Sequence, residues 1–179
     1  TALEIEERID AEGNVLRAPD PAHIRQQLEQ LKTTGVESLA ICLLHSFANP
    51  EHEELVARLA AEAGFDEISV SSRLSPLIKI VSRGDTTVMD AYLNPILKDY
   101  IHKLRTPLKN CELKLMTSAG GLVDADHFVG KDSILSGPAG GVIGYSRVAE
   151  TAGFPRSIGF DMGGTSTDVS RFDGEYERE

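Results

Sequence analysis

The sequence predicts an α/β fold in which a mixed, mainly parallel sheet is layered with helices. Short strand-like runs alternate with two amphipathic helical segments over residues 15–71, which is the β-α-β-α-β order of such folds. The run from Leu39 to Leu44 is continuously apolar, as in a strand that is covered on both faces. Glycine-rich turns follow later strands, at the strand ends where open α/β sheets place ligands.

The first elements are a short hairpin and a capped helix. Residues 3–10 alternate partly between apolar and polar side chains, Glu12–Asn14 is a turn, and a second strand begins at Val15. Asp20 is placed to cap a helix with Pro21 at its first position, and Gly35 ends that helix. Because the chain begins in what resembles a sheet, we expect it to be a piece of a longer protein.

The next elements repeat the strand–helix order. We expect a strand over residues 36–44, a helix that begins around Asn49-Pro50-Glu51 and closes at Gly64, and a strand over residues 68–71. A helical stretch follows from Thr86 to Leu104, and Pro95 inside it predicts a kink or a split.

The last third contains a strand at residues 113–116, a helix and a hairpin. The helix begins at Ser136 or Gly137, with Pro138 at its first position, and ends near Gly153. Its small residues predict very close packing against another helix or a ligand. Residues 158–170 then form a strand, a glycine turn and a second strand.

Composition excludes several classes of partner. The 179 residues allow one or at most two domains, with 41% hydrophobic and 26% charged residues, as in globular proteins. A formal net charge of −10 argues against nucleic acid and anionic membranes as main partners. Cys42 and Cys111 are expected to be buried free thiols, which fits a reducing cytoplasm. His45 follows an apolar run and is expected to have a structural role rather than to bind a metal.

The hairpin carries the residues expected to bind phosphate. Glycines can take backbone angles closed to other residues, and successive N–H groups at such a turn make a nest for an anion. Hydroxyl side chains add donors. The residues concerned are Gly163, Gly164, Thr165, Ser166 and Thr167. Asp161 and Asp168 would repel phosphate unless a cation stands between them, so they are the candidates for catalysis and for holding hydrated Mg²⁺ through water. A plain hairpin with ordinary turn chemistry is the alternative.

Two further segments are weaker candidates for lining the nucleotide cleft. One is the turn after the strand at residues 113–116, with Ser118, Gly120 and Gly121, and a plain turn explains it equally well. The other is the start of the following helix, with Gly137, Gly140 and Gly141. Arg83 is expected to pair with Asp85 rather than to bind an anionic substrate.

These segments resemble a known superfold and, within it, one family. A small-residue helix that opens with Pro138-Ala139, followed by a strand and an Asp-x-Gly-Gly hairpin, resembles the actin-like (ribonuclease H-like) ATPases. Residues 135–141 and 160–169 resemble the two most recognisable blocks of the ATP-dependent hydantoinase/oxoprolinase family. Residues 43–53, 70–72 and 90–95 resemble further blocks, and residues 79–84 and 168–177 are more similar to 5-oxoprolinases than to N-methylhydantoinases.

The resemblance implies a domain plan and an activity. Residues 1–134 would be the remainder of a first actin-like domain, 135–155 the connector helix between domains, and 156–179 the start of a second domain with the phosphate hairpin. The implied reaction is ATP-driven opening of 5-oxo-L-proline to glutamate, with ADP and phosphate as products, as part of glutathione metabolism. It would need Mg²⁺ and a monovalent cation such as K⁺. The alternatives are an N-methylhydantoinase, a ketone carboxylase subunit, or a non-catalytic nucleotide-gated module.

The same resemblance implies partners and a limit. The substrate would be a small cyclic amide, and the full-length protein would be a homo-oligomer or would pair with a second hydantoinase-type subunit or domain. The superfold also needs a first phosphate hairpin and an adenosine-binding glycine segment, and neither motif occurs in residues 1–179. We therefore expect residues 1–179 alone neither to bind ATP tightly nor to hydrolyse it.

Overall fold

The computed structural model describes residues 1–108 and 111–176. The chain divides into two compact units, Thr1–Lys103 and Leu104–Glu179. The division into residues 1–134, 135–155 and 156–179 stays a prediction.

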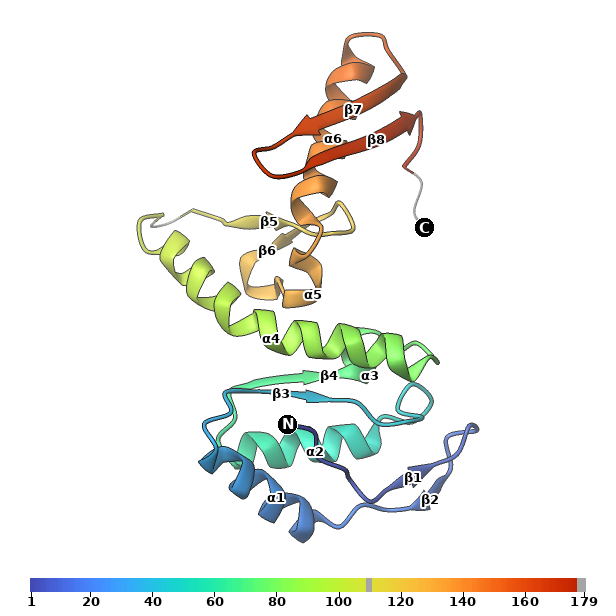
Figure 1. Cartoon of the computed structure of the whole chain (residues 1–179), viewed down its shortest axis with the longest axis vertical. Helices are drawn as coiled ribbons and strands as arrows, with labels where there is room; N and C mark the ends of the chain where they lie inside the picture. Colours follow the sequence, from blue (N-terminus) through green and yellow to red (C-terminus); the bar gives the residue numbers. More distant parts are fainter. Residues whose placement is uncertain (109–110, 177–179) are drawn as a thin grey trace. The chain divides into compact units, whose positions relative to one another are not determined.

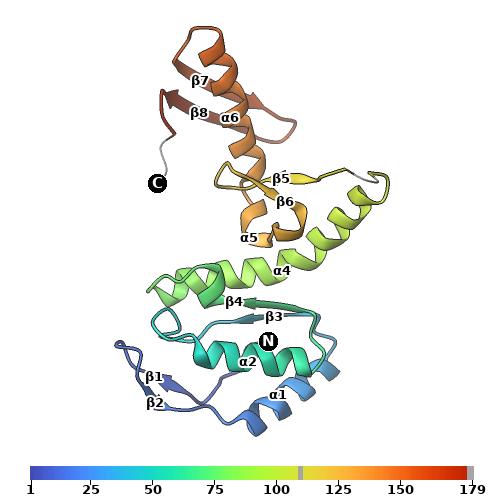
Figure 2. The same cartoon turned by 180° about the vertical axis from the view of Figure 1, so that it is seen from behind.

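The first unit is a layered α/β arrangement. In both views, helices α1 and α2 lie on one side of the two-stranded sheet β3–β4, and α4 lies on the other (Figures 1 and 2). Its elements are β1 (Arg8–Ile9), β2 (Val15–Arg17), α1 (Pro21–Thr33), β3 (Ser38–Ile41), α2 (Glu51–Glu62), β4 (Glu67–Val70), α3 (Ser71–Leu74) and α4 (Ile80–Arg105). The predicted α/β class is confirmed in this unit.

The sheet of the first unit is parallel, as the sequence predicts. Ser38 pairs with Glu67, and the register runs without a break to Ile41 opposite Val70. Apolar side chains of α1, α2 and the strands form one buried cluster, which includes Ile24, Leu28, Val56, Leu59, Phe65 and Val70. Asp20 caps α1 by accepting a 2.9 Å hydrogen bond from the Ala22 N–H, as predicted.

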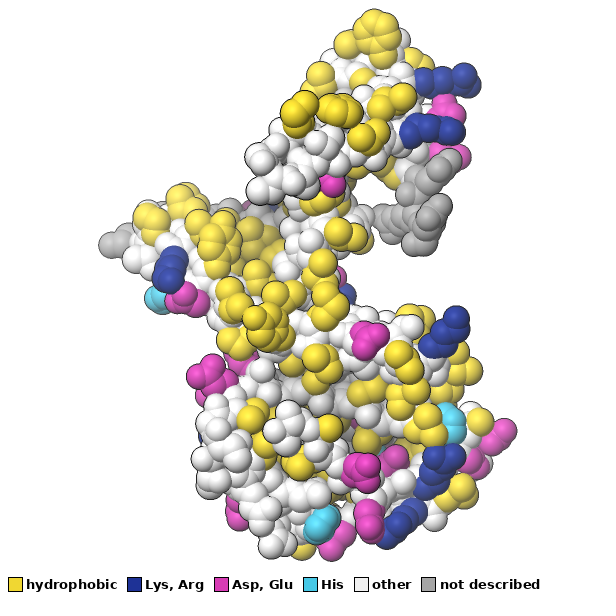
Figure 3. Space-filling view, in the orientation of Figure 1, with side chains coloured by type: hydrophobic (Ala, Val, Ile, Leu, Met, Phe, Trp, Pro, Cys, Tyr) yellow, Lys and Arg dark blue, Asp and Glu magenta, His cyan; other side chains and the backbone are white. Residues whose placement is uncertain are grey.

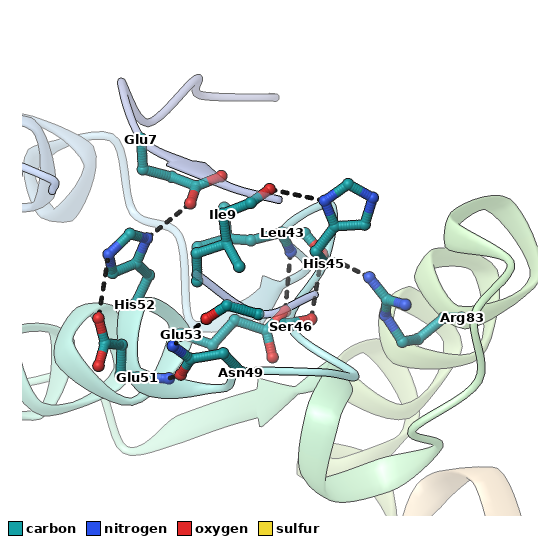
Figure 4. Close-up of polar contacts among 11 residues, drawn as sticks. Glu7, Ile9, Leu43, His45, Ser46, Asn49, Glu51, His52, Glu53 and Arg83 are labelled. Atoms are coloured by element: carbon teal, nitrogen blue, oxygen red, sulfur yellow. Dashed lines mark hydrogen bonds and ion pairs between the residues drawn. The ribbon is translucent and has the colours of Figure 1, made fainter. Parts of the chain in front are cut away.

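The N-terminal segment is bound to the loop between β3 and α2 and to the first turn of α2 (Figure 4). His45 Nδ1 lies 2.6 Å from the Ile9 carbonyl oxygen, and the Asn49 amide donates to the Gly13 carbonyl at 3.0 Å. The buried His52 Nδ1 lies 2.6 Å from Glu7 Oε2. The predicted structural role of His45 is confirmed.

Helix α4 begins at Ile80, six residues before the predicted start at Thr86, and Pro95 does not split it. The helix begins early because Arg83 is held inside the first unit. Its side chain is fully buried and donates to the carbonyl oxygens of Leu43, Leu44 and Leu77.

Arg83 is also connected to the buried carboxylate of Glu53. Arg83 Nε donates to Ser71 Oγ at 2.9 Å, and that hydroxyl donates to Glu53 Oε1 at 2.6 Å. Glu53 also accepts hydrogen bonds from the backbone N–H groups of Leu43 and Ser72. The predicted Arg83–Asp85 pair is wrong, because backbone carbonyls and Ser71 receive the guanidinium's hydrogen bonds. Binding of an anionic substrate by Arg83 is equally unsupported, since the side chain is fully buried.

The second unit is built around helix α6. Its elements are β5 (Lys114–Met116), β6 (Leu122–Asp124), a 3-10 helix η1 (Ala125–His127), α5 (Gly130–Ser133), α6 (Ser136–Thr151), β7 (Arg156–Met162) and β8 (Thr167–Asp173). Strands β5 and β6 form one antiparallel hairpin and β7 and β8 another, and α6 packs against β5, β7 and β8. The described residues therefore form four two-stranded sheets, one parallel and three antiparallel, so the parallel pairing that the sequence predicts to dominate is limited to β3–β4.

Two further findings bear on the expected environment. Cys42 and Cys111 are both free thiols; Cys42 is half-buried, but Cys111 is exposed, so the prediction that both are buried is wrong for Cys111. Within residues 1–108 and 111–176, none of the helices combines the length and the apolar character needed to cross a bilayer.

Candidate functional site

The predicted phosphate hairpin is present as β7 and β8. The two strands pair in continuous antiparallel register from Arg156 opposite Asp173 to Met162 opposite Thr167. Residues 163–166 form the tip, which is closed by a 2.9 Å hydrogen bond from the Gly163 N–H to the Ser166 carbonyl. The segment therefore has the strand–turn–strand form that its sequence predicts.

One face of this hairpin packs on α6 and carries the two candidate carboxylates. Side chains alternate between the faces of a strand, so three register pairs share the face toward α6. These pairs are Ser157 with Phe172, Gly159 with Ser170, and Asp161 with Asp168. The two aspartates are exposed and lie directly opposite each other. Like charges in that arrangement destabilise a sheet, and a cation between them removes the repulsion.

Helix α6 presents a bare backbone to these carboxylates. A Cβ built on Gly141 would lie 3.9 Å from Asp161 Oδ2, so the helix approaches the carboxylate without an intervening side chain. Gly140 instead faces Met116, and nothing lies within 4 Å of a Cβ built on Gly137. A Cβ on Gly140 would lie 3.6 Å from Met116 Cγ, and the distances at Gly140 and Gly141 are those of ordinary contacts with strand residues, so the predicted very close packing of these glycines against another helix or a ligand is not found.

The donor set fits a hydrated divalent cation. The described residues contain no group of three or more His, Cys, Asp or Glu side chains that could hold a metal ion. Asp161 and Asp168 are only two, but Mg²⁺ usually keeps several waters and is held by one or two carboxylates together with substrate phosphates. Both carboxylates are exposed, so such waters can reach them.

The backbone angles at the hairpin tip do not require glycine. Neither Gly163 nor Gly164 has a left-handed φ, so the unusual backbone angles expected from the sequence are absent there. A Cβ on Gly163 would lie 3.4 Å from the Ser166 carbonyl oxygen, and a Cβ on Gly164 would meet nothing within 4 Å. The space around Gly164 is therefore open to a group from outside the described chain.

The hydroxyl residues of the motif do not all lie on one face. Thr165 and Ser166 are in the tip, whereas Thr167 pairs with Met162 at the first register position of β8. By strand alternation Thr167 projects to the face opposite Asp168. The structure brings Asp161, Asp168 and Gly141 together and leaves Thr167 apart from them.

The second predicted turn lies against the same helix. Residues 117–121 join β5 to β6, and the Ser118 hydroxyl accepts from the Leu135 N–H at 2.9 Å while donating to the Asp132 carbonyl at 2.8 Å. Gly120 has φ +80°, and a Cβ there would lie 2.8 Å from Ile143 Cδ1. Gly121 lies close to the Thr117 side chain, with its N–H 3.3 Å from Oγ1. These contacts give Ser118 a structural role at the start of α6 and Gly120 a structural role against the middle of that helix.

One contact beside the site was missed in the sequence. The ring of Tyr145 on α6 lies over Gly159, and its hydroxyl accepts a 3.3 Å hydrogen bond from Ser170 Oγ. A glycine inside a strand marks a close approach by another group, and Gly159 interrupts the strand in this way. That signal could have identified the position, although not its partner.

Comparison with known proteins decides the family. Residues 83–179 match the Hydantoinase/oxoprolinase family, and residues 1–64 match the Hydantoinase/oxoprolinase N-terminal region. The chain belongs to the hydantoinase/oxoprolinase family. The resemblance of the sequence blocks to this family is confirmed.

Relatives and solved structures agree with this assignment. The chain is 47% identical to 5-oxoprolinase of Saccharomyces cerevisiae over 169 residues, which cover 91% of the chain but only 13% of the yeast protein. The ATP-dependent caprolactamase of Pseudomonas jessenii has a similar structure, with a TM-score of 0.84 and 28% identity over 93% of this chain and 25% of that one. Nucleotide-free acetone carboxylase gives a TM-score of 0.79 and 26% identity over 96% and 26% of the two chains. These neighbours are consistent with the actin-like ATPase fold.

Proposed function

We propose that the full-length protein containing this chain is an ATP-dependent cyclic amidase that opens 5-oxo-L-proline to glutamate, with ADP and phosphate as the other products. The observation that carries the proposal is the pair Asp161–Asp168, opposed on one face of a hairpin and approached by the bare backbone of α6 at Gly141. The choice of substrate rests on the 47% identity to the yeast 5-oxoprolinase.

The chemistry explains why such a site would be needed. A lactam carbonyl is resonance-stabilised and a poor electrophile, and transfer of the γ-phosphoryl group to its oxygen makes the carbon open to attack by water. In that transfer the lactam oxygen bonds to phosphorus and ADP leaves. Two waters then complete the reaction: one opens the ring at the C–N bond, and the second releases phosphate.

The residues of this chain would bind and orient the phosphates. Asp161 and Asp168 would hold the waters of a bound Mg²⁺, which supplies charge neutralisation for phosphoryl transfer. The tip, where a Cβ on Gly164 would meet nothing within 4 Å, would admit the phosphate oxygens to the backbone N–H groups. A monovalent cation such as K⁺ is part of the proposal, and the two free thiols support a reducing, cytoplasmic compartment.

Pairing of the full-length protein with itself or with a second hydantoinase-type subunit is also part of the proposal. So is the expectation that residues 1–179 alone do not bind ATP tightly. Micromolar ATP affinity of this chain in calorimetry would contradict that expectation.

The test is turnover by the full-length protein. Purified enzyme with ATP, Mg²⁺ and 5-oxo-L-proline should form ADP, phosphate and glutamate in equal amounts, and Asp161→Asn should abolish this. Asp173→Asn is the matched control, because Asp173 lies at the far end of β8 and pairs with arginine side chains. ADP formation stimulated by N-methylhydantoin, caprolactam or a ketone with bicarbonate, but not by 5-oxo-L-proline, would replace the substrate with one of those classes.

A further inference from the structure

The contact between Tyr145 and Gly159 joins helix α6 to the hairpin beside the candidate carboxylates. A Cβ built on Gly159 would lie 2.5 Å from Tyr145 Cδ1 and 2.8 Å from Cζ, and closer still to Cε1. Carbon atoms in contact are normally about 3.5–4.0 Å apart. Only glycine therefore allows the ring to lie this close to β7.

This contact and the Gly141–Asp161 approach are successive positions of one helix–hairpin interface. Tyr145 and Gly141 are four residues apart, so they lie on the same side of α6, about 6 Å apart along its axis. Gly159 and Asp161 are two residues apart on one face of β7, about 7 Å apart. Because these two distances are nearly equal, the contact of Tyr145 with Gly159 lies directly beside the contact of Gly141 with Asp161 along the interface.

The ring is fixed in this position by its neighbours. Its hydroxyl bonds to Ser170, which is the register partner of Gly159, so one side chain contacts both strands. The next residue of the helix, Ser146, is fully buried and lies 2.8 Å from the Tyr176 hydroxyl, whose ring packs on Phe172 with centroids 5.1 Å apart. Neither the helix nor the hairpin can shift at this point without breaking these contacts.

We propose that Tyr145 is a positioning residue, which sets the gap between the α6 backbone at Gly141 and the Asp161–Asp168 pair. The thickness of the Tyr145 ring sets the distance between the helix and the hairpin, and the missing side chain of Gly159 provides the space for that ring. The proposal rests on the proposed function, because the gap matters to activity only if it holds the phosphates and their cation. A wider or narrower gap would change the affinity for the nucleotide but not the affinity for the lactam.

The experiment uses the full-length enzyme and four variants. Gly159→Ala forces the ring away and should raise the KM for ATP by about tenfold, equivalent to about 1.4 kcal/mol of nucleotide binding, with the KM for 5-oxo-L-proline unchanged. Tyr145→Leu in the Gly159→Ala background replaces the ring with a smaller side chain while the added methyl takes up part of the freed space, so the gap should return close to its original width and most of the loss should be recovered. Tyr145→Phe keeps the ring and should stay within about twofold of wild type. Gly144→Ala is the control, because a Cβ there meets nothing within 4 Å.

The outcomes separate this proposal from the proposed function. A lower melting temperature for Gly159→Ala with an unchanged KM for ATP, or no recovery in the double variant, would overturn the positioning role. If wild-type enzyme does not turn over ATP, the proposed function fails, and hydrogen exchange of the backbone amides of residues 161–168 then decides the positioning role. Faster exchange in Gly159→Ala that the double variant reverses supports it, and unchanged exchange overturns it.

Discussion

Removal of the buried Arg83 side chain is predicted to destabilise the first unit strongly. Arg83→Met keeps much of the apolar stem but removes the guanidinium. The carbonyls of Leu44 and Leu77 lose the donor that Arg83 supplies, the carbonyl of Leu43 keeps only the Ser46 hydroxyl, and the carboxylate of Glu53 loses the positive charge connected to it through Ser71.

The magnitude follows from burial. A buried acceptor left without a partner costs about 1–3 kcal/mol, and leaving a buried charge uncompensated costs about 3–5 kcal/mol. Because water can enter and satisfy part of the network, we expect a loss of about 3–5 kcal/mol. That is a large share of the roughly 5–15 kcal/mol that stabilises a typical domain.

The assay is urea unfolding followed by far-ultraviolet circular dichroism. Arg73→Met is the matched control, because Arg73 bonds to Glu54 on the surface, with side chains 57% and 41% exposed, where an ion pair is worth about 0.2–1 kcal/mol. If Arg83→Met loses no more stability than Arg73→Met, the buried network does not contribute as described. In the double variant with Glu53→Gln, the loss should be smaller than the sum of the two single losses, because both residues belong to one network.

Three further predictions concern other parts of the chain. Asp168→Asn should raise the stability of residues 1–179 by about 0.2–1 kcal/mol in urea unfolding, since it removes the like charge opposite Asp161, and should abolish ATP turnover by the full-length enzyme. Gly120→Ala should lower the melting temperature, because its φ is left-handed and a Cβ would meet Ile143. The hydrogen bond from Arg73 lowers the pKa of Glu54, so the pair stabilises the fold at pH values above the ordinary carboxyl pKa. This stabilisation is lost as the pH falls through the lowered pKa of the folded state. The Glu54→Gln variant should therefore lose less stability than wild type when the pH falls below about 4.5.

Each of these has a contradicting result. An Asp168→Asn variant less stable than wild type would mean that the carboxylates do not repel each other in the folded chain. Gly144→Ala is the control for Gly120→Ala; it lies in α6 with a right-handed φ and open space, and it should be neutral or stabilising by up to about 1 kcal/mol. An acid unfolding curve that is the same in wild type and Glu54→Gln would show that the Arg73–Glu54 pair does not contribute.

Local signals predicted α1, α2 and the hairpin well. The cap at Asp20 and the left-handed glycines at positions 35 and 64 follow from the chemistry of neighbouring residues, so the bounds of α1 and α2 are close to those expected. The hairpin at residues 156–173 was found because its strands flank a glycine turn. In the site, the opposition of Asp161 and Asp168 follows from that hairpin and its register.

Interactions between distant parts of the chain could not be predicted in this way. Residues 83–85 precede the predicted helix start at Thr86, yet they lie inside α4, because Arg83 bonds to carbonyls about forty positions earlier and Gly84 lies close to Cys42. The contact of Tyr145 with Gly159 depends on how a helix packs on a strand, which periodicity does not encode. The exposed position of Cys111 was missed for the same reason.

The face of the β7–β8 hairpin opposite α6 is apolar and exposed, so it can associate with other protein surfaces. Ile158, Phe160 and Met162 are 73%, 63% and 71% exposed on β7, and Val169 is 64% exposed on β8. Yellow side chains gather over this hairpin in the space-filling view (Figure 3). A sheet is normally covered on its apolar face, and the chain spans only 13% of the yeast relative, so preparations of residues 1–179 will need low protein concentration to remain monodisperse.

Helix α6 has a consequence for the order of folding. Four of its sixteen residues are glycine, and each lowers helix stability by about 0.8–1.0 kcal/mol relative to alanine, so the isolated segment would be largely a random coil. The helix can persist only once Ile143 has packed under the turn at Gly120 and Tyr145 over Gly159. The glycines that leave the backbone bare toward the carboxylates thus make α6 a late-forming element. The helix forms together with the strands on which it packs and does not nucleate their folding.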